Sequence, residues 1–142
     1  MSHCKICHPV LSGELRSHFR RNFRREGRKI SQKGKAVKFQ IWDTAKQEKY
    51  RSVNKLFYSD AQVALLVYDI TRMETFNEIK DYWYLQVIEN APPGIQMVLV
   101  GNKSDLYEFQ EVPTEDVKKF AEEKKAEFFE CSAKTASGVA VR

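Results

Sequence analysis

The chain has 142 residues, of which 42% are hydrophobic and 12% aromatic, so it contains enough apolar side chains for one hydrophobic core. This composition argues against disorder throughout, and no apolar run approaches the ~18 residues that a transmembrane helix needs. The net charge of +5 comes from residues 1–36, which hold 10 Lys and Arg against two acids. Because the rest of the chain is mildly acidic, the charge does not indicate a nucleic-acid partner for the whole protein.

Residues 1–36 read as a basic leader that we expect to be poorly ordered. Its best strand candidate, the string ICHPVL, is interrupted by His8 and Pro9, and proline fits badly inside a sheet. The sequence shows no secretory signal, and its three cysteines are an odd number, so we expect a cytoplasmic protein without a disulfide framework.

Two other uses of the leader stay open. One is zinc binding, for which the candidate ligands are Cys4, Cys7, His18 and either His3 or His8. The other is binding of RNA or of an anionic membrane surface by arginines that alternate with aromatic residues. The residues concerned are Arg20, Arg21, Arg24, Arg25 and Arg28, with Phe19 and Phe23.

From Val37 onward the sequence alternates between strand-like and helix-like segments. Residues 37–43 alternate apolar and polar side chains, which is typical of a half-exposed strand, and this strand ends at Asp43. Residues 63–70, VALLVYDI, are apolar at every position up to the acid. This pattern predicts a strand that is buried on both faces of a parallel sheet.

The second half continues the alternation. A helix begins near Thr75 and ends before Pro92, and its apolar stripe consists of Phe76, Ile79, Trp83 and Val87. A buried strand follows at 96–100, then a helix from Thr114 to Lys125, and then a last strand from 127. The order strand, helix, strand, helix, strand predicts an α/β fold with a parallel sheet.

The most unusual polar residues of the chain come directly after three of these strands. They form the strings DTAKQ at 43–47, GNKSD at 101–105 and CSAK at 131–134. Ligands of open parallel sheets bind at the carboxyl ends of the strands, so these strings predict one binding site.

The string Asn102-Lys103-Ser104-Asp105 suits a guanine base. The Asp105 carboxylate can accept two N–H bonds from the edge of guanine, which adenine cannot offer, and a purine ring can lie along the apolar stem of Lys103.

Residues 37 to about 139 resemble a Rab-type small GTPase of the Ras superfamily. The resemblance is carried by WDTA-x-QE at 42–48, LLVYDIT at 65–71, VGNKSDL at 100–106 and ECSAKT at 130–135. It implies a P-loop NTPase-like (Ras-like) three-layer α/β fold and a GTPase that acts as a switch in vesicle trafficking. It also implies GTP or GDP and magnesium as cofactors, and trafficking effectors or regulators that bind residues 44–58.

The resemblance also assigns site residues by position. Asp43 would hold magnesium through water, and Gln47 would orient the attacking water. The residues that would read guanine are Asn102, Lys103 and Asp105, with Ser132, Ala133 and Lys134 completing the base pocket.

The sequence departs from the family pattern in several places. No string G-x-x-x-x-G-K-[ST] occurs, Lys46 stands where the family has glycine, and the switch threonine is missing. We therefore expect an incomplete fold in 37–142 that lacks the phosphate-loop strand and the last helix. The strands that contain Phe39 and Leu66 would then either pair directly or leave unpaired inner edges.

Because of these departures we expect weak nucleotide binding and impaired hydrolysis by this chain. The alternative is a non-enzymatic interaction protein, or a truncated gene product derived from a GTPase. The sequence also shows no cysteine-bearing prenylation tail, so it does not support a lipid anchor.

Overall fold

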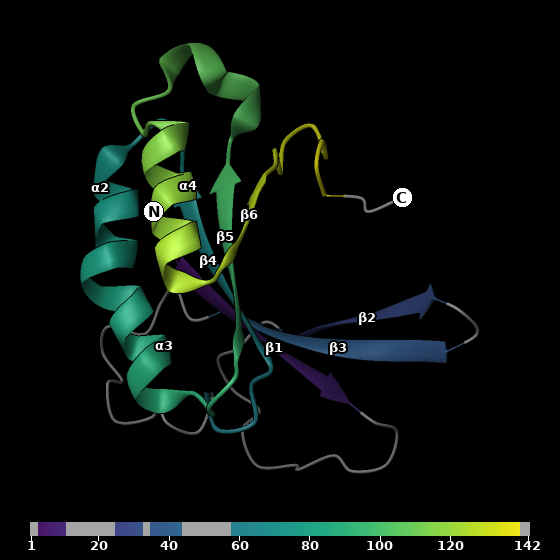
Figure 1. Ribbon diagram of the computed structural model, residues 1–142. Helices are drawn as coiled ribbons and strands as arrows, with labels where there is room; N and C mark the ends of the chain where they lie inside the picture. Colours follow the sequence, from purple (N-terminus) through teal and green to yellow (C-terminus); the bar gives the residue numbers. More distant parts are fainter. Residues whose placement is uncertain (1–2, 11–24, 33–34, 44–57, 140–142) are drawn as a thin grey trace.

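The computed structural model describes residues 3–10, 25–32, 35–43 and 58–139 (Figure 1). For the first three segments it gives the backbone and the strand pairing. The described strands form one six-stranded sheet in the order β2-β3-β1-β4-β5-β6. Their bounds are β1 His3–Val10, β2 Arg25–Gln32, β3 Lys35–Asp43, β4 Val63–Asp69, β5 Gln96–Asn102 and β6 Glu127–Glu130.

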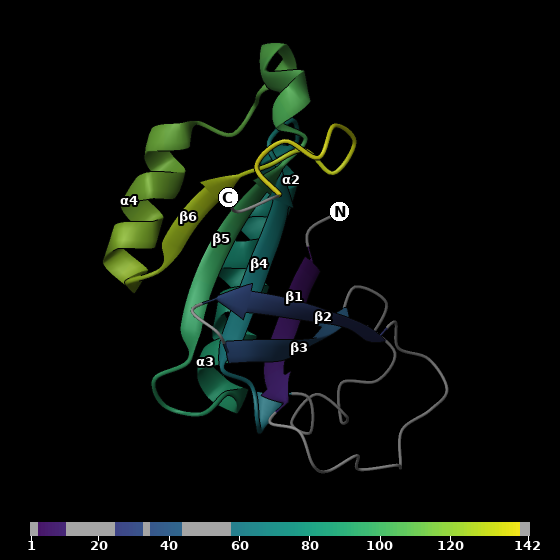
Figure 2. The same ribbon diagram turned by 90° about the vertical axis from the view of Figure 1, so that its right-hand side faces the viewer.

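The sheet has a parallel half and an antiparallel half. Strands β4, β5 and β6 are parallel, as the alternation of strands and helices predicted. Strand β1 lies between β3 and β4 and runs antiparallel to both, and β2 and β3 form an antiparallel ribbon at the other edge. Figure 2 shows this ribbon crossing away from the parallel strands.

The prediction that residues 1–36 contain no strand is wrong. Both β1 and most of the β2–β3 ribbon come from this segment, and β1 occupies the place between β3 and β4 that was expected to be empty or closed by direct pairing. Pro9 is tolerated because pairing of β1 with β4 ends at Cys7, so that Pro9 has a paired neighbour only in β3. There it behaves as in an edge strand.

One face of the parallel strands packs against the helices. Helix α4 (Thr114–Lys124) lies beside a longer helical segment made of α2 (Met73–Glu78), η1 (Ile79–Trp83) and α3 (Tyr84–Asn90) (Figures 1 and 2). The Phe120 ring of α4 meets the Phe76 and Tyr84 rings of that segment, both at a centroid distance of 5.8 Å. A 3-10 helix, η2 (Ser104–Phe109), follows β5.

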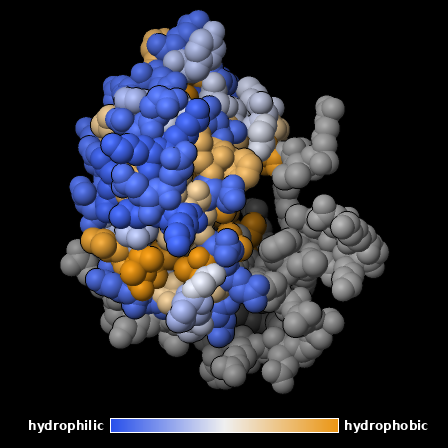
Figure 3. Space-filling view, viewed as in Figure 1, coloured by the Kyte–Doolittle hydropathy of each residue, from blue (hydrophilic) through white to orange (hydrophobic). Residues whose placement is uncertain are grey.

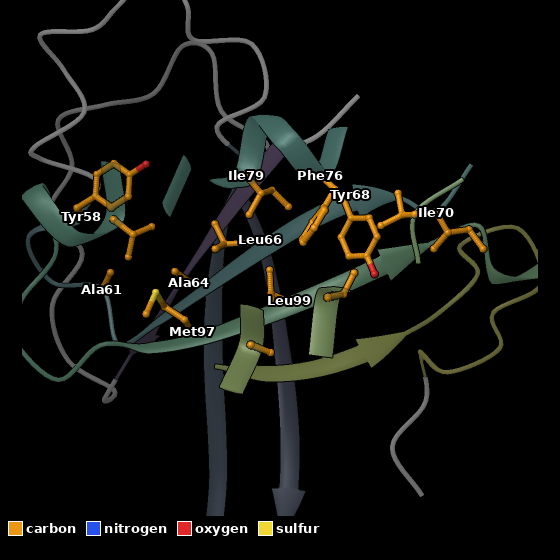
Figure 4. Close-up of a cluster of buried hydrophobic side chains, with 14 residues drawn as sticks. Tyr58, Ala61, Ala64, Leu66, Tyr68, Ile70, Phe76, Ile79, Met97 and Leu99 are labelled. Carbon is orange, nitrogen blue, oxygen red and sulfur yellow. The ribbon is translucent and has the colours of Figure 1, made fainter. Parts of the chain in front are cut away.

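The core lies between this helical layer and the sheet (Figure 4). Alternate residues of β4 and β5 point into it, whereas their neighbours in the strands are only half-buried. These strands were predicted to be buried on both faces, and in the described residues the prediction is confirmed for the face toward the helices and wrong for the other face. The buried hydrophobic residues of the two strands are Ala64, Leu66, Tyr68, Met97 and Leu99.

The helical segment after β4 contains one turn of π-helix, η1. Its buried residues Ile79 and Val87 are eight positions apart, and in a regular α-helix eight residues rotate about 80° past two full turns. The wider π turn absorbs the extra residue and returns Val87 to the face that Ile79 occupies. The predicted stripe is thus confirmed, with Phe76, Ile79 and Val87 buried and Trp83 packed against the core.

The outward side of the helical layer is mainly polar. In the space-filling view hydrophilic residues cover most of this face, and hydrophobic colour gathers toward the α3 end (Figure 3). Helix α3 carries the exposed Leu85 and Ile88.

Candidate functional site

The carboxyl ends of the parallel strands meet at one edge of the sheet. Strand pairing aligns Asp69, the last residue of β4, with Asn102, the last residue of β5. One further backbone hydrogen bond links the two strand ends, from Ile70 N–H to Asn102 O at 3.2 Å. Strand β6 ends beside them, since Cys131 N–H donates to Gly101 O at 2.8 Å. The two loops that were predicted to share a site therefore start side by side.

Side-chain hydrogen bonds join the loop after β5 to the loop after β6. The Ser132 hydroxyl donates to Asp105 Oδ1 at 2.5 Å, and Ala133 N–H donates to Asn102 Oδ1 at 3.1 Å. The backbone adds a third link, from Ser104 N–H to Cys131 O at 3.1 Å. The structure thus brings together the two groups of residues that were proposed to read guanine.

Ser132 is the centre of the second loop. It is fully buried, and its hydroxyl oxygen also accepts Thr135 N–H at 3.2 Å while its own N–H donates to Ser137 O at 2.9 Å. Ala133 and Lys134 are exposed at the tip of this loop. Gly138 closes it with a φ of +72°, where an added Cβ would overlap the carbonyl oxygen of Glu130.

Lys103 lies between the two loops in an unusual backbone conformation. Its φ of +66° is in the left-handed region, which non-glycine residues seldom adopt and which is found disproportionately at functional sites. Its side chain is 49% exposed, and its ammonium forms an ion pair with Asp69 Oδ2 at 2.5 Å. Lys103 therefore extends toward β4, while Asn102 and Asp105 extend toward the loop after β6.

Asp69 is a buried acid that the sequence analysis did not select. Its other carboxylate oxygen, Oδ1, accepts Thr71 N–H at 2.9 Å and the Thr71 hydroxyl at 2.7 Å. Burial raises the pKa of the Asp69 carboxyl, but the hydrogen bonds from Lys103 and Thr71 outweigh burial and hold this pKa below its ordinary value. Asp69 is thus ionised at neutral pH, with Oδ1 hydrogen-bonded to Thr71 and Oδ2 paired with the Lys103 ammonium.

Thr75 supports the same position from the helix. Asp69 N–H donates to Thr75 Oγ1 at 3.0 Å, and the Thr75 hydroxyl donates to Arg72 O at 2.7 Å. The helix begins at Met73, two residues before the predicted start near Thr75, so Thr75 lies inside the first turn and connects that turn to the end of β4. The sequence did contain a signal for Asp69, because this acid ends the buried strand predicted at 63–70, much as Asp43 ends the strand predicted at 37–43.

Gly101 allows the end of β5 to close over Tyr68. A Cβ at this position would lie 2.8 Å from the Tyr68 hydroxyl and 3.1 Å from Ile70 Cγ2. Tyr68 is buried against Phe76, with ring centroids 5.4 Å apart, and burial, together with the nearby Glu130, raises the pKa of its phenol. The glycine before Asn102 therefore has a packing role.

The residues expected on the phosphate side are less completely placed. The backbone puts Asp43 at the end of β3, where its partner is Lys5 of β1, and Lys5 in turn pairs with Leu65 of β4. Asp43 is therefore level with Leu65 in the first half of β4, and Asp69 lies four residues farther along that strand. Gln47 and Lys46 lie outside the described residues, and the Asp43 side chain is not described.

Metal binding can be examined in part of the chain. Among side chains that the structure describes, no group of three or more His, Cys, Asp or Glu residues could hold a metal ion. The zinc and RNA hypotheses for the leader stay predictions, because His18 and most of the arginines lie outside the described residues, as do the side chains of Cys4 and Cys7. In the described helices there is also no stretch long and apolar enough to span a membrane.

Comparison with known proteins matches most of the chain to one family. A profile of the Ras family matches residues 18–141, a range that begins inside the segment interpreted as a leader. The chain is 46% identical over 112 residues to the Ras-related protein Rab-11A of Dictyostelium discoideum, which covers 79% of this chain and 52% of that protein.

Two plant proteins give similar results. Identity is 49% over 106 residues with the Ras-related protein RABA1b of Arabidopsis thaliana, covering 75% of this chain and 49% of that protein. It is 43% over 112 residues with the GTP-binding protein YPTM2 of Zea mays, covering 79% and 55%. The chain spans about half the length of these curated relatives.

Proposed function

The chain belongs to the Ras family and is of the Rab type, and on this basis we propose that it binds a guanine nucleotide at the joined ends of β5 and β6. The observation that carries the proposal is the pair of hydrogen bonds from Ser132 to Asp105 and from Ala133 to Asn102. They hold two loops that are distant in sequence against one another at the edge where parallel sheets bind ligands.

Asp105 supplies selectivity for guanine. An ionised carboxylate offers about four lone-pair positions, and the Ser132 hydroxyl takes one of them on Oδ1. The rest can accept the two N–H groups on the guanine edge, and adenine leaves this carboxylate unmatched. A missed polar contact of this kind lowers affinity by up to about 10⁴-fold in a site built for it.

The other residues shape the pocket around the ring. The apolar stem of Lys103 provides a surface on which a purine can stack, and Asn102 holds the Ala133 backbone in place. Lys134 lies next to Ala133 and would close the opposite side. The side chains of Asn102, Lys103 and Asp105 already have partners close to the strand ends, so little rearrangement of them is needed on binding.

We also propose that binding is weak and hydrolysis slow. In related proteins phosphate contacts and a magnesium ion neutralise the charge of the nucleotide, and the sequence here contains no G-x-x-x-x-G-K-[ST] string. Asp43 would hold the ion through water and Gln47 would orient the attacking water. Lys46 in the place of glycine would crowd the approach to the γ-phosphate.

The role of the chain as a trafficking switch is a further part of this proposal. Effectors or regulators would bind residues 44–58, of which the structure describes Tyr58 alone. This part of the proposal is supported by the family and by the matched relatives.

A thermal-shift measurement tests nucleotide binding. We expect millimolar GDP and GTP to raise the melting temperature of the chain and ATP to leave it unchanged, because a ligand that binds only the folded state stabilises it by mass action. Each nucleotide is measured with and without magnesium, and the Asp105→Asn variant is the control that should lose the guanine preference. Equal shifts with ATP, or no shift with any nucleotide, would refute the proposal.

A further inference from the structure

The ammonium of Lys103 forms an ion pair with Asp69, and this ion pair takes no part in the proposed contacts to guanine. Lys103 must keep a left-handed backbone conformation and a fixed side-chain direction if its stem is to form one wall of the base pocket. A half-exposed lysine normally samples many rotamers, and ordering it on binding lowers affinity. In this chain the ordering has already occurred, because the ammonium is paired with Asp69 at 2.5 Å.

Asp69 is itself held in place by three donors. Thr71 binds Oδ1 through both its N–H and its hydroxyl, at 2.9 and 2.7 Å, and Lys103 binds Oδ2. The side chain is 5% exposed, and the Asp69 backbone is fixed through Thr75 at 3.0 Å. Because the Asp69 carboxylate is held in one position, it also restricts the position of the Lys103 ammonium.

From these contacts, and resting on the proposed guanine site, we infer that Asp69 is a positioning residue for base recognition: its buried carboxylate, oriented by Thr71, holds the Lys103 stem flat against the place of the purine ring. Asp69 makes no contact with the nucleotide. It acts through Lys103 on stacking and leaves the reading of the guanine edge to Asp105.

The separate roles of Asp69 and Asp105 can be distinguished by measuring the affinity for two nucleotides. Loosening Lys103 weakens the stacking of any purine, so Asp69→Asn should lower the affinity for GDP and for inosine diphosphate by the same factor, about tenfold for one ordered lysine side chain. The preference between these two nucleotides, which depends on the exocyclic amine and Asp105, should not change. Asparagine keeps the size of the side chain and an oxygen that can accept from Thr71.

The first experiment is independent of nucleotide. Amine acetylation of the nucleotide-free chain, read by mass spectrometry, should be slower at Lys103 than at the exposed Lys119 of α4. In Asp69→Asn the Lys103 rate should rise several-fold toward the Lys119 rate, and in Asp81→Asn, the same change at an exposed acid, it should stay as in the unmodified sequence. Equal Lys103 rates in all three proteins would overturn the inference.

The second experiment measures affinity by calorimetry with GDP and inosine diphosphate. Loss of about tenfold for both ligands in Asp69→Asn supports the inference. Unchanged affinity in Asp69→Asn, with binding by the unmodified chain, overturns it and leaves the proposed function intact. No binding by the unmodified chain overturns the proposed function and the positioning role together.

A second variant tests the same inference if Asp69→Asn does not fold. Thr71→Val removes one donor to Asp69 Oδ1 and keeps the charge and the ion pair. It should show smaller changes of the same sign in Lys103 acetylation and in both affinities. Changes in neither measurement, in a variant whose circular dichroism is native, would again overturn the inference.

Discussion

The Ser132 hydroxyl lies 2.5 Å from Asp105 Oδ1, and this contact joins two loops that are 27 residues apart in sequence. Ser132 is fully buried and Asp105 is half-buried, so the bond is sheltered from water on one side. Hydrogen bonds to charged groups in such places contribute more than neutral ones. The contact therefore fixes the geometry of the proposed site before any ligand arrives.

Replacing Ser132 with alanine should loosen both loops. The variant loses the bond to Asp105 and the acceptor for Thr135 N–H, and we expect the free energy of unfolding to fall by about 1–3 kcal/mol. Urea denaturation measures this loss. Ser137→Ala is the control, because that residue is exposed and contributes its backbone carbonyl to Ser132, and it should change stability by less than about 0.5 kcal/mol.

Gly138→Ala should be more harmful than Gly94→Ala. Both glycines have positive φ, at +72° and +84°, so both substitutions incur the cost of a left-handed conformation, about 1 kcal/mol. A Cβ at position 94 meets nothing within 4 Å, whereas one at position 138 overlaps the Glu130 carbonyl oxygen. Denaturant midpoints of the two variants give the comparison. Equal losses would mean that the loop relaxes around the methyl group.

Gly101 and Tyr68 should show energetic coupling. Gly101→Ala places a methyl group 2.8 Å from the Tyr68 hydroxyl, so we expect it to destabilise the chain, and Tyr68→Phe should relieve part of the clash. In a double-mutant cycle the two substitutions together should destabilise the chain by about 1 kcal/mol less than the sum of their separate effects. Additive effects of the two substitutions would show that the strand end moves instead.

The π turn predicts opposite results for a deletion and an insertion. Deleting Asp81 leaves Ile79 and Val87 seven positions apart, a spacing that a regular α-helix places within about 20° of one face. This deletion should change the free energy of unfolding by about 1 kcal/mol or less. Inserting one alanine after Asp81 turns Val87 away from the core and should cost about 2–4 kcal/mol. A harmful deletion, measured by thermal unfolding, would contradict this account.

Asp69 should contribute to stability in a pH-dependent way. Because its pKa is lowered in the folded chain, its contribution is complete above the ordinary carboxyl pKa of about 3.9 and is lost as the pH falls through the lower folded value. Unfolding free energies measured from pH 6 downward should therefore decline less steeply in Asp69→Asn than in the unmodified chain. Parallel declines would show that Asp69 is not the group responsible.

The parallel half of the sheet could be predicted from the sequence, because apolar runs indicated its strands and polar strings marked where these strands end. The segments at 63–70, 96–100 and 127–130 were expected as strands, and the structure places them side by side in one direction. The two polar strings that follow β5 and β6 come together as predicted. Parallel strands constrain where their ends meet, so a local pattern was sufficient.

Strand β1 could not be predicted from local pattern. Its sequence carries two cysteines, two histidines and a proline, and pairing on both sides is what makes it a strand. Backbone hydrogen bonds from two neighbours can override a weak β propensity, and such long-range pairing leaves no periodicity in the segment itself. The π turn was hidden for a related reason, since a helical stripe with one extra residue still looks regular over short windows.

Strand β1 also determines the order in which the sheet can be completed. It comes before both of its partners, β3 and β4, in the sequence, and His3 pairs with Val67. Until β4 emerges, the segment has no second neighbour, and folding of the sheet centre must follow synthesis of residues 63–69. The two halves of the sheet are therefore joined by a strand that can be paired on both sides only after β4 has been synthesised.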